Sequence, residues 1–314
     1  MDYIINMLAK PETVTTTQTG VSSPDAAVEL YIKNSLVCFS SLRINGGLKE
    51  MKLLLFINWD MSVEWRAAFE KEGVELIYLP FGKYAIGSSF AWGIVQYRYD
   101  VMEYLSEHLD DMDRILMLDT DIYCAGSLRP LFEEMDDRLL LYDVQHSCDN
   151  PERKVILDNL EKIYGERRYF THWGGEFTGC RVKTLRRLFE GCRKVMADSA
   201  KVSDLVNFND EHITSAAADR DEELKAAPAN AYVCRFWTIR NFYLSGTNYR
   251  FNRVVLWHMP AEKKRTMLWL YDHYIKNGSY PSDEKIARIM GLPKAAPRES
   301  IARYVSALKY RKVH

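Results

Sequence analysis

Apolar residues in the first half of the chain gather in short runs, and longer segments with a helical period separate these runs. Four segments have the composition of strands: 13–19, 52–58, 74–80 and 114–119. A long helix is expected after the start signal Ser22-Ser23-Pro24-Asp25, with further helices over 61–72 and 92–109. Strands that alternate with helices predict a parallel sheet covered by helices on both faces, in three layers.

The second half of the chain is more broken. Helices are expected over 182–197 and 209–218, and a β-like stretch over 251–258. After Pro260 the pattern predicts short helices separated by proline and glycine. We therefore expect a catalytic domain over residues 1–265 and a helical C-terminal extension over residues 266–314.

Composition and charge narrow the classes of function. The chain has 314 residues, of which 47% are hydrophobic, enough for a sizeable core. Its 42 basic and 43 acidic residues nearly cancel, so no global field attracts nucleic acid, and we expect no nucleic-acid partner. The six cysteines include no CxxC pair, which favours reduced, buried thiols. The N-terminus lacks the basic flank of a signal peptide, which favours a cytoplasmic protein.

Candidate chemistry first appears where the predicted apolar strand at 114–119 ends. Asp119 and Asp121 follow this strand with only Thr120 between them. Ligands of α/β sheets bind beyond the carboxyl ends of strands, and two adjacent carboxylates repel each other unless a cation lies between them. Hard oxygen ligands of this kind favour Mg²⁺ or Mn²⁺. The alternative is a solvated loop whose aspartates cap a helix.

The segment around these carboxylates resembles a known metal site. Residues 114–132, RILMLDTDIYCAGSLRPLF, are similar to the metal-site segment of retaining glycosyltransferases of the glycogenin and lipopolysaccharide-galactosyltransferase family, family eight. Upstream, Tyr97-Arg98 resembles the Tyr-x-Arg-Leu stretch of that family, whose arginine reaches toward the donor. The resemblance thus makes Arg98 a donor contact, together with Asp119 and Thr120 of the metal-site segment. The alternative for Arg98 is a surface arginine of a helix.

Two downstream segments extend the resemblance. Residues 172–179, HWGGEFTG, are similar to the Gly-Gly-x-Phe-x-Gly of the blood-group and α-1,3-galactosyl transferases, family six, which implies that Gly174 and Gly175 line the donor sugar. An ordinary tight turn is the alternative. Residues 209–215, NDEHITS, resemble the acidic stretch that opens a helix in both families. This implies catalytic roles for Asp210 and Glu211, with Glu211 facing the anomeric carbon, although both are also favoured first-turn residues of any helix.

The run Val254 to His258 looks like the final motif of family eight. There the histidine is the third metal ligand and a lysine contacts the diphosphate, which implies those roles for His258 and Lys264. Lys263 competes with Lys264 for the second role, because the Gly-Pro that normally precedes the lysine is absent. A second departure is that 15–18, TTTQ, stand where the family's first strand ends in an acidic residue.

Taken as a guide, the resemblance implies a GT-A type, Rossmann-like mixed α/β sheet with flanking helices. It implies a retaining hexosyltransferase of polysaccharide biosynthesis that uses Mn²⁺ or Mg²⁺ and a UDP-sugar, UDP-galactose or UDP-glucose, with a glycan or lipid-linked acceptor. Two other classes of protein are compatible with the Asp119-Thr120-Asp121 sequence. Asp119 could be the nucleophile of a haloacid-dehalogenase-type phosphohydrolase, or the chain could be a non-catalytic binding module with a glycosyltransferase fold.

The end of the chain raises the question of membrane contact. Residues 296–314 place apolar side chains at near-helical spacing among arginines and lysines. A basic amphipathic helix of this kind can lie on an anionic membrane surface, which suits a lipid-linked acceptor. The alternative is a helix that packs on the catalytic domain.

Overall fold

The computed structural model describes most of the chain. The described residues are 1–10, 23–48, 50–84, 93–136, 138–147, 149–167, 169–236, 238 and 254–292. The predicted strand at 13–19 and the predicted amphipathic helix at 296–314 lie outside the described residues, as does the start of the predicted β-like stretch at 251–258.

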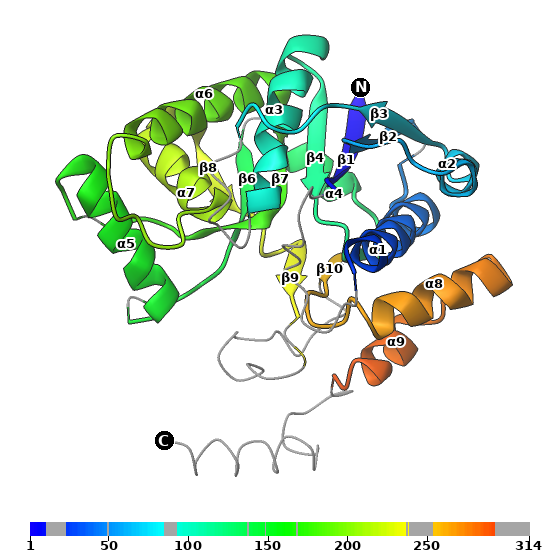
Figure 1. Ribbon diagram of the computed structural model, residues 1–314. Coiled ribbons are helices and arrows are strands. Elements are labelled where there is room, and N and C mark those ends of the chain that lie inside the picture. The colour runs from blue at the N-terminus through cyan, green and yellow to red at the C-terminus, as the bar shows by residue number, and fades with distance from the viewer. Residues whose placement is uncertain are drawn as a thin grey trace, which may run out of the picture.

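A large mixed sheet forms the centre of the molecule (Figure 1). Among the described residues its strands follow the order β3-β2-β1-β4-β7-β6-β8. Their bounds are β1 Asp2–Leu8, β2 Met51–Ile57, β3 Val74–Tyr78, β4 Arg114–Leu118, β6 Leu139–Asp143, β7 Trp173–Arg181 and β8 Ala226–Pro228. The strands β1 to β4 are parallel, whereas β7 runs antiparallel to both β4 and β6. The sheet is therefore parallel in the first half of the chain and mixed as a whole.

The first strand differs from the prediction. The sequence pattern assigns it to 13–19, but β1 occupies Asp2–Leu8 and lies between β2 and β4. A central parallel strand is buried on both faces and reads as an almost continuous apolar run, which the N-terminal residues provide. The ammonium group of Met1 also lies 2.7 Å from Asp113 Oδ1, which ties the start of β1 to the turn before β4.

The central strands send alternate side chains into two separate cores. Ile4 faces one core and Ile5 the other, as expected from the two-residue repeat of a strand. The helices α1 (Pro24–Asn45), α2 (Val63–Lys71) and α4 (Arg129–Glu134) cover the first core. The helices α3 (Tyr97–His108), α6 (Val182–Ser199) and α7 (Asp210–Arg220) cover the second, and α5 (Pro151–Tyr164) lies beside α7. The three predicted layers are present.

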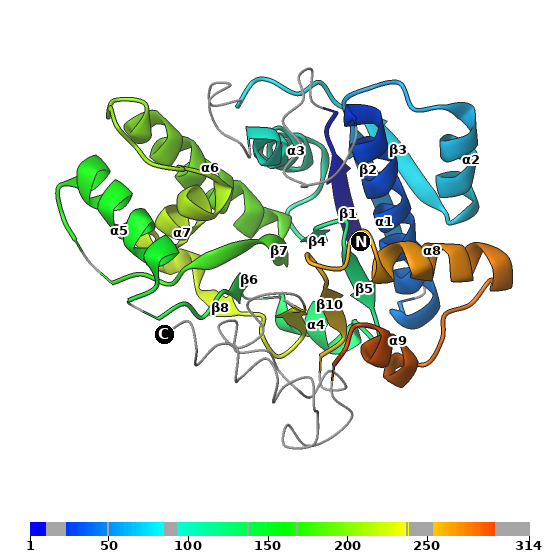
Figure 2. The ribbon, with the colours of Figure 1, turned by 60° about the horizontal axis from the view of Figure 1, so that its bottom comes forward.

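A small second sheet lies at the end of β4. It consists of β5 (Ile122–Cys124), β10 (Leu256–His258) and β9 (Val233–Arg235), in that order. A third apolar cluster joins this sheet to α8 (Thr266–Asn277) and α9 (Asp283–Ile289), with Trp257 at its centre. Short 3₁₀ turns at Gly93–Gln96 and Glu222–Leu224 complete the described elements. The small sheet thus brings the chain around residue 258 next to the loop that leaves β4 (Figure 2).

The boundary predicted at residue 265 falls immediately before α8. This helix lies beside α1 in both views, and Arg43 Nη2 of α1 donates to Tyr274 Oη of α8 at 2.8 Å (Figures 1 and 2). Within the described ranges, no helix combines the length and the apolar character that crossing a membrane requires.

Candidate active site

The two sheets bring Asp119, Asp121 and His258 together. Asp119 directly follows β4 and Asp121 directly precedes β5, whereas His258 is the last residue of β10. The antiparallel pairing of β10 with β5 places His258 opposite Ile122. As a result, one ligand atom from each of the three residues lies within 4.8 Å of the others. His258 Nε2 is 3.2 Å from Asp121 Oδ2 and 3.6 Å from Asp119 Oδ2.

Two atoms of this cluster fit a metal site particularly well. Asp121 Oδ2 and His258 Nε2 are buried, and neither makes a hydrogen bond of suitable geometry to a described residue. Their close neighbours are ion-pair contacts, to each other at 3.2 Å and from Asp121 Oδ2 to Lys263 Nζ at 3.4 Å. Buried polar atoms normally have a partner, because leaving one unpaired costs about 1–3 kcal/mol. The unpaired atoms here are a carboxylate oxygen and an imidazole nitrogen, which are common metal ligands. Asp119 is 46% exposed, so the cluster is open on that side.

The charges of the cluster are strongly coupled. Burial favours the neutral form of Asp121, but Lys263 and His258 outweigh it and hold the pKa of this carboxyl well below its usual range. Burial lowers the pKa of His258, whereas Asp121 and Glu176 raise it to about 9. Desolvation and the neighbouring Asp121 raise the pKa of Asp119 to about 6, against the opposing effect of His258. A divalent cation would relieve the repulsion between the two carboxylates.

A buried carboxylate on β7 supports the histidine. Glu176 Oε1 lies 3.1 Å from His258 Nδ1, and the side chain of Glu176 is fully buried. Arg235 of β9 pairs with both oxygens, since its Nε donates to Oε1 at 2.6 Å and its Nη2 to Oε2 at 2.5 Å. Burial would raise the pKa of Glu176, but Arg235 and His258 lower it to about 2. Glu176 is therefore an ionised carboxylate next to the candidate metal ligands.

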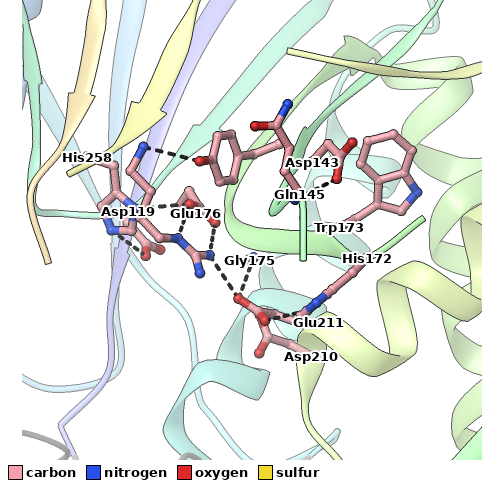
Figure 3. A network of polar contacts seen from close by, with 12 residues as sticks. Asp119, Asp143, Gln145, His172, Trp173, Gly175, Glu176, Asp210, Glu211 and His258 are labelled. Carbon is pink, nitrogen blue, oxygen red and sulfur yellow. Dashed lines mark hydrogen bonds and ion pairs between the residues drawn. The ribbon is translucent and has the colours of Figure 1, made fainter. Parts of the chain in front are cut away.

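The same arginine reaches Glu211 at the start of α7. Arg235 Nη2 lies 3.0 Å from Glu211 Oε1, and His172 Nε2 lies 2.9 Å from Glu211 Oε2. The backbone N–H of Gly175 also donates to Glu211, at 3.3 Å. Burial is outweighed by Arg235 and His172, so the pKa of Glu211 lies well below its usual range. Figure 3 shows this network from the cluster at Asp119 and His258 to Glu211.

Asp210 takes part in a second buried pair. Arg98 Nη1 donates to Asp210 Oδ2 at 2.8 Å and to the carbonyl of Gly175 at 3.0 Å, and its Nη2 donates to Thr178 Oγ1 at 3.1 Å. Only 3% of Arg98 is exposed, so the alternative of a surface arginine is wrong. Burial raises the pKa of Asp210 despite the charge of Arg98. The structure thus places Arg98 and Asp210 together next to Gly175.

The adjacent glycines lie against both ion pairs. A Cβ on Gly174 would lie 2.2 Å from Glu176 Oε2 and 2.7 Å from Arg235 Nη2. A Cβ on Gly175 would lie 2.4 Å from Asp210 Oδ2 and 3.2 Å from Arg98 Nη1. These glycines therefore allow the ion pairs to approach the main chain of β7. Their predicted contact with a sugar remains a prediction.

The two lysines that competed for one role have different surroundings. Lys263 Nζ lies 3.4 Å from Asp121 Oδ2 and also 5.4 Å from the centre of the Tyr31 ring. Burial would lower the pKa of Lys263, but Asp121 raises it. Lys264 is partly buried, and Thr120 is buried between the two aspartates. The geometry thus brings Lys263 to the cluster. The phosphate contact of Lys264 stays a prediction.

Glu176, Arg235 and His172 were not among the predicted site residues. Glu176 and His172 lie inside the glycine-containing segment at 172–179, and Arg235 ends a strand that the sequence pattern did not identify. A signal was present, because a charged residue inside an apolar, strand-like run is rarely buried without a partner. Two opposite charges in two such runs would have suggested a pair.

Among known proteins, this chain is similar to solved structures. No protein-family model matches the chain, and no curated protein matches it. The galactosyltransferase LgtC, in complex with donor and acceptor sugar analogs, has a TM-score of 0.54 at 15% identity, over 96% of this chain and 100% of LgtC. An active-site mutant of LgtC has a TM-score of 0.57 at 15% identity and the same coverage. Mouse xyloside xylosyltransferase 1, in its apo form, has a TM-score of 0.53 at 12% identity, over 84% of this chain and 99% of that chain.

These likenesses, at such low identity, show the fold. The mixed sheet with flanking helices is the GT-A type found in glycosyltransferases, as the fold-class prediction stated.

Proposed function

We propose that this protein is a metal-dependent glycosyltransferase. It moves a hexose from a UDP-sugar, UDP-galactose or UDP-glucose, to a glycan or lipid-linked acceptor with retention of configuration. The observation that carries the proposal is the cluster of Asp119, Asp121 and His258, in which two buried ligand atoms lack hydrogen-bond partners among the described residues. The fold supports the same function, since solved glycosyltransferases share it.

The ligand set favours a cation that is shared with a nucleotide diphosphate. Three protein ligands leave further coordination positions of Mn²⁺ or Mg²⁺ open, and such ions commonly complete their shell with phosphate oxygens. LgtC, whose fold resembles that of this chain, was crystallised with donor and acceptor sugar analogs. A nucleotide-sugar donor and a glycan acceptor follow for this protein as part of the proposal.

Within this proposal, Asp119, Asp121 and His258 hold the cation. When bound, the ion supplies Lewis-acid stabilisation of the charge on the departing diphosphate. Lys263 is next to Asp121 and places a fixed positive charge where that diphosphate would lie. Lys264 and Thr120 remain further candidates for contact with the donor, and Arg98 contributes through its pair with Asp210.

Glu211 is the proposed catalytic carboxylate. Arg235, His172 and the Gly175 N–H keep it ionised and fix its orientation. A fixed negative charge can stabilise positive charge that develops at the anomeric carbon during transfer. Asp210 neighbours Glu211 but is engaged by Arg98, so we assign it a supporting role.

A thermal-shift screen tests the proposal directly. The purified protein is heated with a panel of nucleotide sugars in the presence of Mn²⁺, of Mg²⁺ or of EDTA. A ligand that binds only the folded state raises the melting temperature, so UDP-galactose or UDP-glucose should raise it with metal and not with EDTA. Absence of any metal-dependent shift would contradict the proposal. Hydrolysis of p-nitrophenyl phosphate would instead support a phosphohydrolase.

A further inference from the structure

The residue that joins the candidate metal cluster to the large sheet is Glu176. Its carbonyl oxygen accepts the backbone N–H of Asp119 at 3.0 Å, and its carboxylate lies 3.1 Å from His258 Nδ1. Two of the three candidate ligands are thus held by one residue, Asp119 through the main chain and His258 through the side chain. Glu176 is not itself one of the three candidate ligands.

An irregularity in β7 directs this side chain. Along the pairing of β6 with β7, Leu141 faces Thr178 but the next residue, Tyr142, faces Gly174. The register thereby passes over residues 175–177, which form a bulge that contains Glu176. Bulges commonly re-aim a side chain next to an active site. Here the bulge carries a fully buried carboxylate toward His258.

The shortest ion-pair contacts of Glu176 are those to Arg235, which also pairs with Glu211, and not the contact to the histidine. Arg235 contacts both carboxylate oxygens, which gives the bidentate geometry expected of a strong pair. A buried ion pair costs desolvation and is weak evidence for a purely stabilising role. The additional contact to His258 Nδ1 connects this pair to the candidate metal ligands.

That contact has a chemical consequence for the histidine. An ionised carboxylate only accepts hydrogen bonds, so the Nδ1 that faces it carries the proton. The other ring nitrogen, Nε2, faces Asp119 and Asp121, 3.6 and 3.2 Å from their oxygens, and is the ring nitrogen that this cluster offers to a cation. Metal-binding histidines usually have such a partner on the second nitrogen, and losing it typically weakens metal binding 10–100-fold.

We infer that Glu176 is the positioning residue of the metal site: its carboxylate holds His258 with Nε2 directed at the Asp119–Asp121 pair, and its carbonyl anchors Asp119. The inference rests on the proposed function only in taking a divalent cation as the ligand of this cluster. Glu176 acts through the ligands, because its own side chain is fully buried.

The test measures binding of Mn²⁺ in the presence of UDP by electron paramagnetic resonance of the free ion. Glu176→Gln removes the charge, and Glu176→Asp keeps the charge but shortens its reach to His258. Both variants should bind Mn²⁺ about 10–100-fold more weakly than the wild type. Because the measurement is of binding, it needs no acceptor and no turnover.

The matched control is Glu72→Gln. Glu72 is also buried and paired with an arginine, Arg43, and it accepts from Tyr274 Oη, between α1, α2 and α8. This variant removes the charge of a buried glutamate whose arginine partner is half exposed, and it does so away from the cluster. It should therefore lower the melting temperature but leave Mn²⁺ affinity unchanged. If both Glu176 variants bound Mn²⁺ as tightly as Glu72→Gln, the inference would be overturned.

A double variant asks whether Glu176 acts through the histidine. In a His258→Ala background the two aspartates and UDP retain weak binding, and adding Glu176→Gln should weaken it by much less than in the wild type. An equal loss in both backgrounds would show that Glu176 does not act through His258. A wild-type protein that bound no Mn²⁺ would overturn both this inference and the proposed function, whereas unchanged variants would overturn the inference alone.

Discussion

Glu211 shows how a single residue can be prepared for chemistry by its neighbours. It lies in the first turn of α7, where the N–H groups of a helix favour negative charge. Arg235 and His172 add direct contacts to its two oxygens at 3.0 and 2.9 Å. These contacts oppose the cost of burial and favour the ionised form at neutral pH. The carboxylate is therefore charged and fixed in place before any ligand arrives.

The first prediction concerns this charge. Glu211→Gln keeps the shape of the side chain and removes the charge, so kcat should fall roughly 10²–10³-fold while donor affinity changes little. Initial rates at varied donor concentration would separate the two effects. Glu223→Gln is a suitable control, because Glu223 is an exposed glutamate paired with Arg187. The activity of this variant should match that of the wild type. A fall in donor affinity alone would mean that Glu211 binds rather than catalyses.

The second prediction concerns Asp121, whose side chain is only 1% exposed and lies between His258 and Lys263. Asp121→Ala removes a metal ligand, so metal-dependent binding of UDP and turnover should both be lost. Circular dichroism should show an unchanged fold. In the wild-type protein EDTA should abolish turnover and added Mn²⁺ should restore it, and full activity in EDTA would contradict the role of a metal.

Residue types and spacing identified the candidate metal ligands, but not the residues that hold these ligands in place. Asp119 and Asp121 stand out because two carboxylates follow an apolar strand, and His258 because it follows another. The pair of Glu176 and Arg235 joins positions 59 residues apart and depends on the bulge in β7 and on the small sheet. The charge of each residue within a strand-like run is a local signal, but it does not identify the partner. The bulge and the small sheet that bring the two residues together have no signature in the local sequence.

At the scale of elements, β7 links the site to the sheet. One edge of this strand pairs regularly with β4, from Arg114–Arg181 to Leu118–Phe177. Its other edge loses register with β6 at the bulge. The regular edge holds Asp119 in place, whereas the irregular edge supplies Gly174, Gly175 and Glu176. The strand thus provides both a rigid support and the residues that surround the cluster.

The third prediction tests the close packing at this bulge. A methyl group on Gly174 would overlap with Glu176 Oε2 and Arg235 Nη2, so Gly174→Ala must displace the ion pair. We expect a loss of about 1–3 kcal/mol in unfolding free energy, typical of an overpacked site, together with weaker Mn²⁺ binding. Urea denaturation gives the first quantity. Gly73→Ala serves as a comparison, because its Cβ meets no atom within 4 Å and its cost comes only from a positive φ of 74°. Wild-type stability and metal binding in Gly174→Ala would contradict this account.

The elements themselves were predicted unevenly. The helix predicted over 182–197 appears as α6, because its long amphipathic period is a local signal. The helix predicted over 209–218 appears as α7, whose start is marked by the capping residue Asn209. The strand β1 was missed, since seven mostly apolar residues fit several structures and their central place depends on pairing with β2 and β4. The predicted β-like stretch at 251–258 contains β10, whereas β5 and β9, with three residues each, were not predicted.

At the scale of the whole molecule, the candidate site lies where the two sheets meet. The large sheet contributes Asp119 and Glu176, and the small sheet contributes Arg235 and His258. Ligands that bridge these groups would couple the two halves of the chain. This arrangement also places Glu211, from the second half, in the same network as the carboxylates that follow β4 (Figure 3).

The last prediction is the stereochemical outcome of transfer. An inverting enzyme needs a general base on the acceptor side of the sugar, whereas a retaining enzyme needs a group beneath the anomeric carbon or a leaving phosphate that guides the acceptor. Both families whose motifs this sequence resembles retain configuration. Glu211 is ionised by Arg235 and His172 and is linked to the metal cluster through Arg235 and Glu176, which suits a charge that stabilises an oxocarbenium-like centre better than a base that must take up a proton. We therefore expect an α-linked product from an α-linked UDP-hexose. The coupling constant of the anomeric proton of the newly formed linkage, measured by NMR on the product, decides the question. A β-linkage would contradict the role of Glu211 and the retaining mechanism, while leaving the metal site to be judged by the Mn²⁺ binding experiments.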